Sequence, residues 1–128
     1  MVTRLRTSKI AKERLENLNA VLRMSNNAVI LRYAIAKSIE CEKNICEDSD
    51  AIVSDNSGFE ITRQTLFGDL EVLFKSLFGI TYKDKDDLFF PTMTNMHIER
   101  GLKILEKEYK FAGNKEKFIN NIIKNLSL

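Results

Sequence analysis

The pattern of hydrophobic and polar residues predicts a short strand and two helices within residues 1–40. In residues 3–7 an apolar side chain alternates with two arginines, which is the period of a strand. Residues 8–23 place their apolar side chains at steps of three and four, which makes one buried stripe along a helix. Residues 25–40 are apolar on more than one face, which predicts a second helix that is covered on several sides.

The order strand, helix, helix is that of a ribbon-helix-helix unit. In such a unit two chains pair their strands into an antiparallel ribbon and interlock their helices, so one chain alone cannot bury its apolar surface. We therefore expect the chain to associate with a second copy. The alternative is a helical hairpin that docks on the rest of the same chain. Ser8 is a suitable N-cap for the first helix, and Ser25, Asn26 or Asn27 for the second.

The remainder of the chain is also predicted to be mainly helical. Amphipathic patterns predict helices over residues 66–78, from Pro91 to about Tyr109, and over residues 115–126. A short alternating segment at residues 59–63 predicts one further strand. We expect a single, mainly α domain over residues 1–128, made of a ribbon-helix-helix-like part (1–40), an acidic surface loop (41–57) and a helical part (58–128).

Composition narrows the class of protein. A chain of 128 residues that is 44% hydrophobic and 30% charged has ordinary soluble composition. No apolar run is long enough to cross a bilayer, and the N-terminus lacks a signal-peptide core, so we expect a cytoplasmic protein. Cys41 and Cys46 fit that compartment as free thiols, and with one histidine they are too few for a zinc site.

Charge is distributed unevenly. Residues 1–40 carry eight Lys or Arg against three acids, whereas residues 41–60 carry one base against six acids. A basic segment of this kind indicates nucleic acid as a partner, although an ordinary oligomer with a solvated charged surface has the same composition. The acidic loop is expected to point away from DNA. The predicted DNA-binding residues are Arg4 and Arg6 on one face of the strand, with Lys9, Lys12 and Arg14 near the first helix.

The sequence offers little for catalysis. His97 is the sole histidine and lies in a predicted helix, where a structural role is more common than general-base chemistry. Acids before a helix usually complement its dipole, so Asp84, Asp86 and Asp87 are not expected to bind metal. The tyrosines are interpreted as packing residues rather than nucleophiles. These tyrosines are Tyr33, Tyr82 and Tyr109. We expect no catalytic residue, no metal and no cofactor.

A motif in the middle of the chain makes the interpretation more specific. The pattern is Glu60-x-x-Arg63-x-Thr65-Leu66-x-Gly68, followed some thirty residues later by Arg100-Gly101. With the N-terminal helix pair, it resembles the DndE family of the bacterial DNA phosphorothioation system, from Arg4 to about Leu105. The resemblance implies a small, mostly helical tetramer with a ribbon-helix-helix-like N-terminal part. It also implies a DNA-binding accessory subunit that favours duplex or nicked DNA, while other subunits carry out the exchange of a phosphate oxygen for sulfur.

The motif residues also have a structural interpretation. Glu60 and Arg63 are three apart and can pair with each other or bind backbone groups near a helix start, and Thr65 can cap a helix that begins at Leu66. Gly68 and Gly101 inside helices indicate close helix crossings. We therefore regard the motif as scaffold. Family members often have glycine between the first two helices; here Asn26 or Asn27 is the residue expected to accept an unusual backbone.

Two other functions are considered. From residues 1–40 alone, the chain would be a ribbon-helix-helix transcriptional repressor that reads an operator through its arginines. Within the phosphorothioation system, a DNA-nicking component is the other possibility. The favoured hypothesis is a non-catalytic DNA-binding subunit with DNA, further copies of itself and the other phosphorothioation subunits as partners.

Overall fold

The computed structural model describes residues 2–24, 26–80 and 85–126. As predicted, the fold is mainly helical, and the described residues include one small two-stranded sheet. The elements are β1 (Arg4–Arg6), α1 (Lys9–Leu22), α2 (Asn27–Glu40), β2 (Glu60–Thr62), α3 (Arg63–Leu66), α4 (Glu71–Leu77), α5 (Thr94–Ala112) and α6 (Lys115–Leu126). Among the described helices, none has both the length and the apolar character needed to cross a bilayer.

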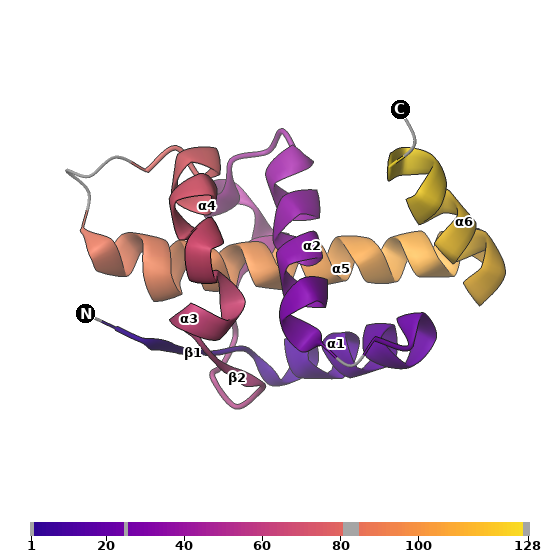
Figure 1. Ribbon diagram of the computed structural model, residues 1–128, viewed down its shortest axis with the longest axis horizontal. Helices are drawn as coiled ribbons and strands as arrows, with labels where there is room; N and C mark the ends of the chain where they lie inside the picture. The colour runs from indigo at the N-terminus through magenta and orange to yellow at the C-terminus, as the bar shows by residue number, and fades with distance from the viewer. Residues whose placement is uncertain (1, 25, 81–84, 127–128) are drawn as a thin grey trace.

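The long helix α5 is the axis around which the other elements pack. Figure 1 shows α5 running through the molecule, with α2 crossing it, α1 below and α6 at its C-terminal end. The largest contact is between α2 and α5, and it buries Leu31, Ile35, Ile98 and Leu102 completely. The core therefore lies on both sides of α5, and each of the other helices takes its position from it.

The strand β1 finds its partner within its own chain. It pairs antiparallel with β2, so that Leu5 lies opposite Ile61 and both side chains are buried. Ser8 caps α1 as predicted, because its side chain accepts a hydrogen bond from the Ala11 backbone N–H. The second strand predicted near residues 59–63 is confirmed, but β1 needs no second copy to complete its pairing.

The two N-terminal helices are also covered by their own chain. The α1 stripe of Ala11, Leu15 and Leu18 is buried, and α1 contacts both α2 and α5. The arrangement is thus the alternative considered above, a helical hairpin docked on the rest of the chain. In this fold the apolar surface of β1 and α1 is covered by other segments of the same chain, without a second copy.

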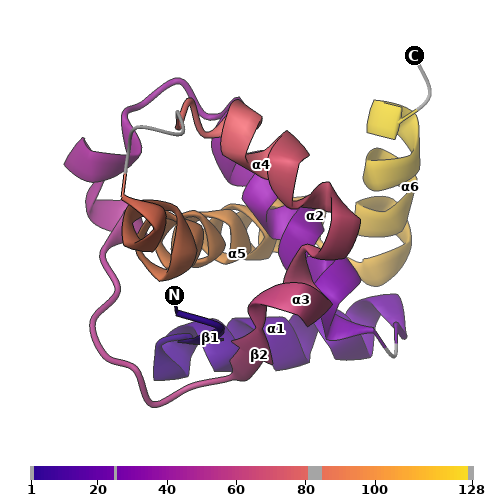
Figure 2. The ribbon, with the colours of Figure 1, turned by 60° about the vertical axis from the view of Figure 1, so that its left-hand side comes forward.

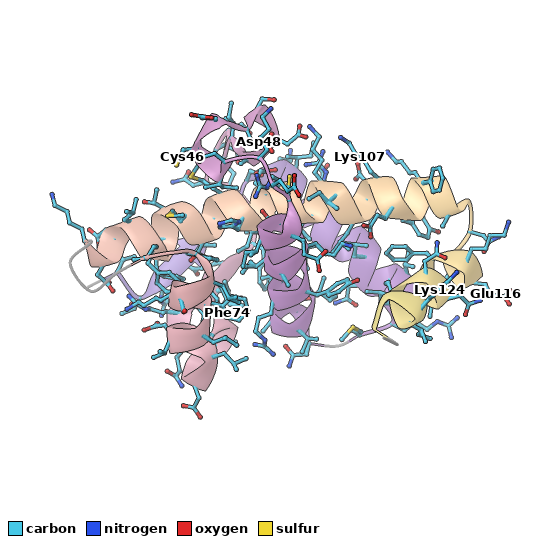
Figure 3. All side chains as sticks on the ribbon, turned by 90° about the horizontal axis from the view of Figure 1, so that it is seen from above. Cys46, Asp48, Phe74, Lys107, Glu116 and Lys124 are labelled. Carbon is cyan, nitrogen blue, oxygen red and sulfur yellow. The ribbon has the colours of Figure 1, made fainter. Side chains whose placement is uncertain are left out.

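The acidic segment 41–57 is held against α5 by ion pairs. It contains two short 3-10 turns, Ile45–Glu47 and Ser49–Ala51, and Figure 3 shows this segment beside α5. Asp50 lies 2.5 Å from the Lys103 ammonium of α5. Hydrogen bonding by Lys103 holds the pKa of Asp50 below its ordinary value. The acids of this segment are therefore partly neutralised by α5.

The helix predicted over residues 66–78 is broken. Its first turn is α3, a 3-10 turn over Gly68–Leu70 follows, and α4 begins only at Glu71. Thr62, not Thr65, caps α3, because the Thr62 hydroxyl accepts from the Thr65 backbone N–H. Gly68 has φ +50 and no neighbour within 3.8 Å of an added Cβ, so it permits a sharp turn and not a close crossing. The prediction was wrong because periodicity does not reveal such a turn.

In the turn between α1 and α2, the residue with the left-handed backbone conformation is not the asparagine that we expected. Arg23 takes the left-handed conformation, with φ 54, and its backbone N–H bonds the Asn19 carbonyl. Asn26 instead acts as the N-cap of α2, accepting from the Ala28 N–H. Helix α5 begins at Thr94, three residues after Pro91, and the preceding segment Leu88–Met93 is kinked at Phe90, which has the extended angles φ −134 and ψ 119.

The crossing of α2 and α5 depends on Gly101. A Cβ at this position would lie 1.9 Å from the Ala34 carbonyl oxygen and 3.0 Å from its Cα. The obstacle is backbone and cannot rotate away. The close crossing predicted for Gly101 is confirmed.

We expect Gly101→Ala to destabilise the fold by at least about 3 kcal/mol, because α2 must move off α5. Ala34→Gly should not rescue it, since the clash is with backbone atoms. Urea unfolding measures both. Gly113→Ala is the control: its φ is +84 with open space around it, and a cost of about 1–2 kcal/mol is expected. Equal losses for the two variants would contradict this account of the crossing.

A buried polar network adjoins the crossing. Arg100 Nε donates to Ser38 Oγ at 2.8 Å, and the same hydroxyl shares a hydrogen bond with His97 Nδ1, also at 2.8 Å. Burial, and then the nearby Arg100 charge, lower the pKa of His97 from 6.5 to about 4. The ring stacks on Phe78 at 4.4 Å.

Stability should fall as the pH is lowered from 6.5 toward 4. In that window the unfolded chain protonates His97 and the folded chain does not, so the stabilising effect of the neutral ring is complete above 6.5 and lost toward 4. The loss is on the order of 3 kcal/mol. His97→Asn keeps an acceptor for Ser38 but cannot titrate, so its stability curve should converge with that of the wild type as the pH falls. Urea midpoints at stepped pH values test this; parallel curves would contradict it.

Candidate nucleic-acid interface

The outer face of the β1–β2 sheet presents two arginines around one glutamate. Arg4 and Arg6 lie on the same face, as predicted, with side chains 67% and 48% exposed. Glu60 on β2 lies between them, 3.7 Å from the Arg4 guanidinium and 3.6 Å from that of Arg6. Exposed pairs at this separation contribute little energy, so the arginines remain available to a phosphate. The face keeps a net positive charge.

The start of α1 adds two exposed ammonium groups. Lys9 and Lys12 are both exposed, and Lys12 reaches Glu16 only at 4.0 Å. The Lys9 backbone N–H donates to Asp55 at 2.9 Å. Hydrogen bonds from the Ser57 and Lys9 amides hold the pKa of Asp55 below its ordinary value. Contact between these lysines and DNA stays a prediction.

Arg14 is placed differently from the other predicted DNA-binding residues. Its side chain is only 11% exposed and lies 3.4 Å from both Glu99 and Glu106 of α5. Glu99 also accepts a 2.5 Å hydrogen bond from Ser8 Oγ, and burial raises the pKa of its carboxyl. In the chain as described, Arg14 fastens α1 to α5, which local spacing cannot reveal because Glu99 is 85 residues away.

A groove beside β2 contains residues that the sequence reasoning did not connect. It has a volume of about 600 Å³ and brings Asn26 and Asn27 at the start of α2 close to Thr62 and Thr65. Amide and hydroxyl groups of this kind bind phosphate oxygens in protein–DNA interfaces. The groove adjoins Glu60 and so continues the arginine face. The sequence analysis had named Asn26 and Asn27 as caps and Glu60 and Thr65 as motif residues, but it gave no reason for them to lie together.

The motif arginine Arg63 holds the segment before α5. Both of its terminal nitrogens donate to the Asp86 carboxylate at 2.7 Å, and its Nε donates to Glu71. These bonds, to Asp86 and then to Glu71, raise the pKa of Arg63. The predicted Glu60–Arg63 pair is wrong, because Glu60 faces β1 while Arg63 turns inward with its side chain 8% exposed.

The other motif residues lie at joints between elements. Leu66 is fully buried, and its carbonyl accepts from Arg32 of α2 at 2.7 Å. Thr65 is exposed, and its hydroxyl bonds that of Thr62 at 2.8 Å. Arg100 donates to the Ser38 carbonyl, the Lys43 carbonyl and Asp48, which ties α2 and segment 41–57 to α5. Gly68 and Gly101 occupy the turn and the crossing described above.

Of the described residues considered for catalysis, His97 and Asp86 are engaged in hydrogen bonds. His97 is 5% exposed, with Nδ1 bonded to Ser38, and Asp86 is bound by Arg63. Asp87 is exposed, while Asp84 and Tyr82 lie outside the described residues. Tyr33 is partly buried, and burial raises the pKa of its hydroxyl. Tyr109 packs edge-on against Phe118, with ring centroids 5.3 Å apart.

Comparison with known proteins agrees with this arrangement. No curated protein matches the chain. The model of the family described as DNA sulphur modification protein DndE matches residues 4–113, a stretch that begins with β1 and ends just after α5. This range contains the arginine face, the Glu60–Gly68 motif and the Arg100-Gly101 pair. The sequence resemblance is thereby confirmed, and the chain belongs to the DndE family of the DNA sulphur modification system.

Proposed function

We propose that this chain is the DNA-binding accessory subunit of the phosphorothioation system and acts in the cytoplasm beside the other subunits. The observation that carries the proposal is the exposed pair Arg4 and Arg6, whose one acidic neighbour among the described residues is Glu60. Guanidinium groups bind phosphates in a fixed, bidentate geometry. A duplex or nicked DNA strand laid along this face would be held through its backbone, with Lys9 and Lys12 at the margin.

Binding through the backbone fits the sheet better than operator reading does. A ribbon-helix-helix repressor inserts a strand pair from two chains into the major groove. Here β1 pairs with β2 of the same chain, and the Asn95 side chain donates to the Arg6 carbonyl at 3.0 Å. The arginines therefore serve the phosphate backbone in this proposal.

We also propose that the chain has no catalytic step of its own. A nicking enzyme needs an accessible nucleophile or base, often with metal ions that polarise the phosphate. His97 is buried in neutral form, and the carboxylate of Asp86 is occupied by Arg63. DNA bound by the protein should therefore remain covalently unchanged.

Gel-shift titrations at two salt concentrations test DNA binding. Arg4→Ala with Arg6→Ala should weaken binding on the order of tenfold or more, uniformly across sequences, and reduce the slope against salt by about one for each arginine. Glu60→Gln should strengthen DNA binding, because it removes the carboxylate that competes with phosphate for the two arginines. Lys43→Ala, at an exposed lysine in the acidic segment, is the control for loss of one positive charge away from the arginine face, and each single arginine variant is compared with it.

Three outcomes would count against the proposal. The first is no retention of duplex or nicked DNA by the wild type at low salt. The second is a loss confined to one sequence, which would support the repressor. The third is cleaved DNA recovered from complexes formed with Mg²⁺, which would support nicking.

We further propose that the chain self-associates as a tetramer and that α4 supplies one of its subunit contacts. This helix buries only Phe74, while Leu73 and Leu77 on the same side are 52% and 49% exposed. Leu70, just before α4, is 42% exposed and continues the stripe. An unpartnered leucine stripe on a short helix marks an interaction surface, and isologous pairing of identical helices is the simplest way to cover it.

Light scattering tests this self-association. Leu73→Glu with Leu77→Glu should reduce the solution mass by at least half, because charged side chains cannot be buried in an apolar contact. Ile52→Glu is the matched control, since Ile52 is 66% exposed and lies in segment 41–57. A monomeric wild type, or an unchanged mass in the double variant, would overturn the α4 proposal.

A further inference from the structure

An aromatic residue at the end of α5 is almost entirely exposed. The Phe111 side chain is 92% exposed, although it lies two residues from the turn at Gly113 that reverses the chain into α6. Its neighbour in space, Phe118, is 1% exposed and packs edge-on against Tyr109. Phe118 therefore anchors α6, while Phe111 takes no part in the core. A large exposed ring beside a docked helix calls for a functional explanation.

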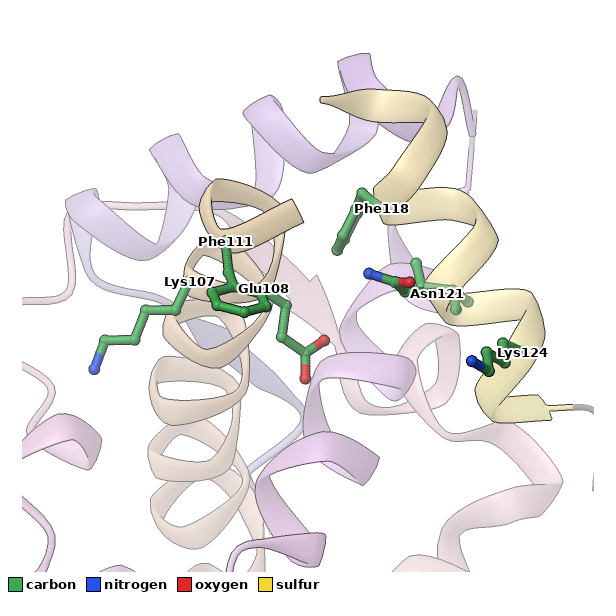
Figure 4. A pocket seen from close by; sticks show the side chains of 7 residues that line it. Lys107, Glu108, Phe111, Phe118, Asn121 and Lys124 are labelled. Atoms are coloured by element: carbon green, nitrogen blue, oxygen red, sulfur yellow. The ribbon is translucent and has the colours of Figure 1, made fainter. Parts of the chain in front are cut away.

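A cavity of about 540 Å³ lies between Phe111 and α6. Figure 4 shows Glu108 on α5 and Phe118 and Asn121 on α6 pointing toward the space between the two helices, while Lys107 on α5 extends away from α6. The lining thus offers aromatic rings, one side-chain amide, the Glu108 carboxylate and the ammonium groups of Lys107 and Lys124. Its volume is in the range that binds a small ligand.

The electrostatics of the cavity are positive. Its lining carries two lysines, Lys107 and Lys124, against one glutamate, Glu108. Glu108 is compensated by Lys37 at 2.9 Å, and Glu106 by Arg14 at 3.4 Å. Lys107 is 65% exposed and reaches Asp50 only at 3.8 Å, while Lys124 has no ion pair within the described part of the chain. The edges therefore attract an anion, and the centre accepts a flat apolar ring.

We propose that this cavity binds an unpaired nucleotide. Phe111 stacks on the base, Asn121 hydrogen-bonds its edge, and Lys107 and Lys124 contact the flanking phosphates. Rings combined with cationic side chains are how proteins hold unpaired bases irrespective of sequence. The site lies at the end of the family match, and α6 falls beyond residue 113. The inference rests on the proposed DNA binding and adds a second contact distant in sequence from the arginine face.

The two lysines of the lining favour a nucleotide over a second copy of the chain or an apolar peptide. A second copy or an apolar peptide would leave the lysines at the edge without partners, whereas a nucleotide supplies both the ring and the negative charge. Phe111 is exposed enough that its replacement should not affect folding.

Fluorescence anisotropy tests the proposal with three labelled probes: a blunt duplex, the same duplex with a ten-thymidine 3′ overhang, and a free ten-thymidine strand. The wild type should bind the overhang duplex about tenfold more tightly than the blunt one. Phe111→Ala should abolish that preference and leave blunt-duplex affinity unchanged. Arg4→Ala with Arg6→Ala should weaken both duplexes and keep the preference. Phe111→Tyr should retain it.

A direct spectroscopic measurement accompanies the titration. The chain contains no tryptophan, so Phe111→Trp introduces a single reporter at the cavity. Its fluorescence should be quenched by the free thymidine strand and not by the blunt duplex, because only an unpaired base can stack on the ring.

The outcomes separate the two proposals. If the blunt duplex does not bind but the free strand does so through Phe111, the arginine proposal fails and the cavity proposal stands. If Phe111→Ala weakens the two duplexes equally, or the wild type shows neither an overhang preference nor quenching of the tryptophan variant, the cavity proposal is overturned. A change of solution mass in Phe111→Ala would assign the ring to a second copy instead.

Discussion

The close crossing of α2 over α5 is the contact on which the rest of the structure depends. Gly101 lets the Ala34 backbone approach so closely that no side chain fits between the helices. Four positions after Ala34 on α2, the Ser38 hydroxyl and carbonyl accept hydrogen bonds from Arg100, which in turn binds segment 41–57. The crossing therefore fixes three parts of the chain at once. Any wider separation would leave the guanidinium buried without its partners, which is among the most costly changes in a protein interior.

Three arginines whose side chains are directed inward bind irregular segments and neighbouring helices to one another. Arg63 joins the turn after α3 to the stretch before α5, and Arg100 joins α2 to the acidic segment. Arg14 joins α1 to α5. The five donors of a guanidinium satisfy several carbonyls or carboxylates at once, which suits segments that lack their own backbone pairing. The basic surface is left to a different set, the arginines of β1 and the lysines of α1, α5 and α6.

The sequence pattern predicted those features of the fold that depend on residues close together in the chain. The Ser8 cap, the α1 stripe, the strand at 60–62 and the α6 boundary all follow from neighbouring residues. Gly101 was predictable because glycine inside a helix needs a packing reason. The pairing of Arg14 with Glu99 and of Arg63 with Asp86 was not, since these partners are 85 and 23 residues apart. The left-handed Arg23 and the turn at Gly68 also escaped prediction, because asparagine and a close crossing were the more common explanations. Of the candidate interface, Arg4 and Arg6 came from the alternating pattern, whereas the groove beside β2 and the Phe111 cavity needed the tertiary fold.

Helix α5 fixes the distance between the arginine face at one end and Phe111 at the other. Asn95, near its first turn, holds the Arg6 carbonyl of the arginine face, and Phe111 stands in its last turn; Figure 2 shows the helix passing from the sheet toward α6. Sixteen residues of α-helix rise about 24 Å, and B-form DNA advances about 3.4 Å per base pair, so the interval corresponds to roughly seven base pairs. Because a helix neither stretches nor bends easily, this interval is constant. On the two proposed contacts, the protein would hold a stretch of DNA backbone at a set distance from a strand end or gap on the same DNA.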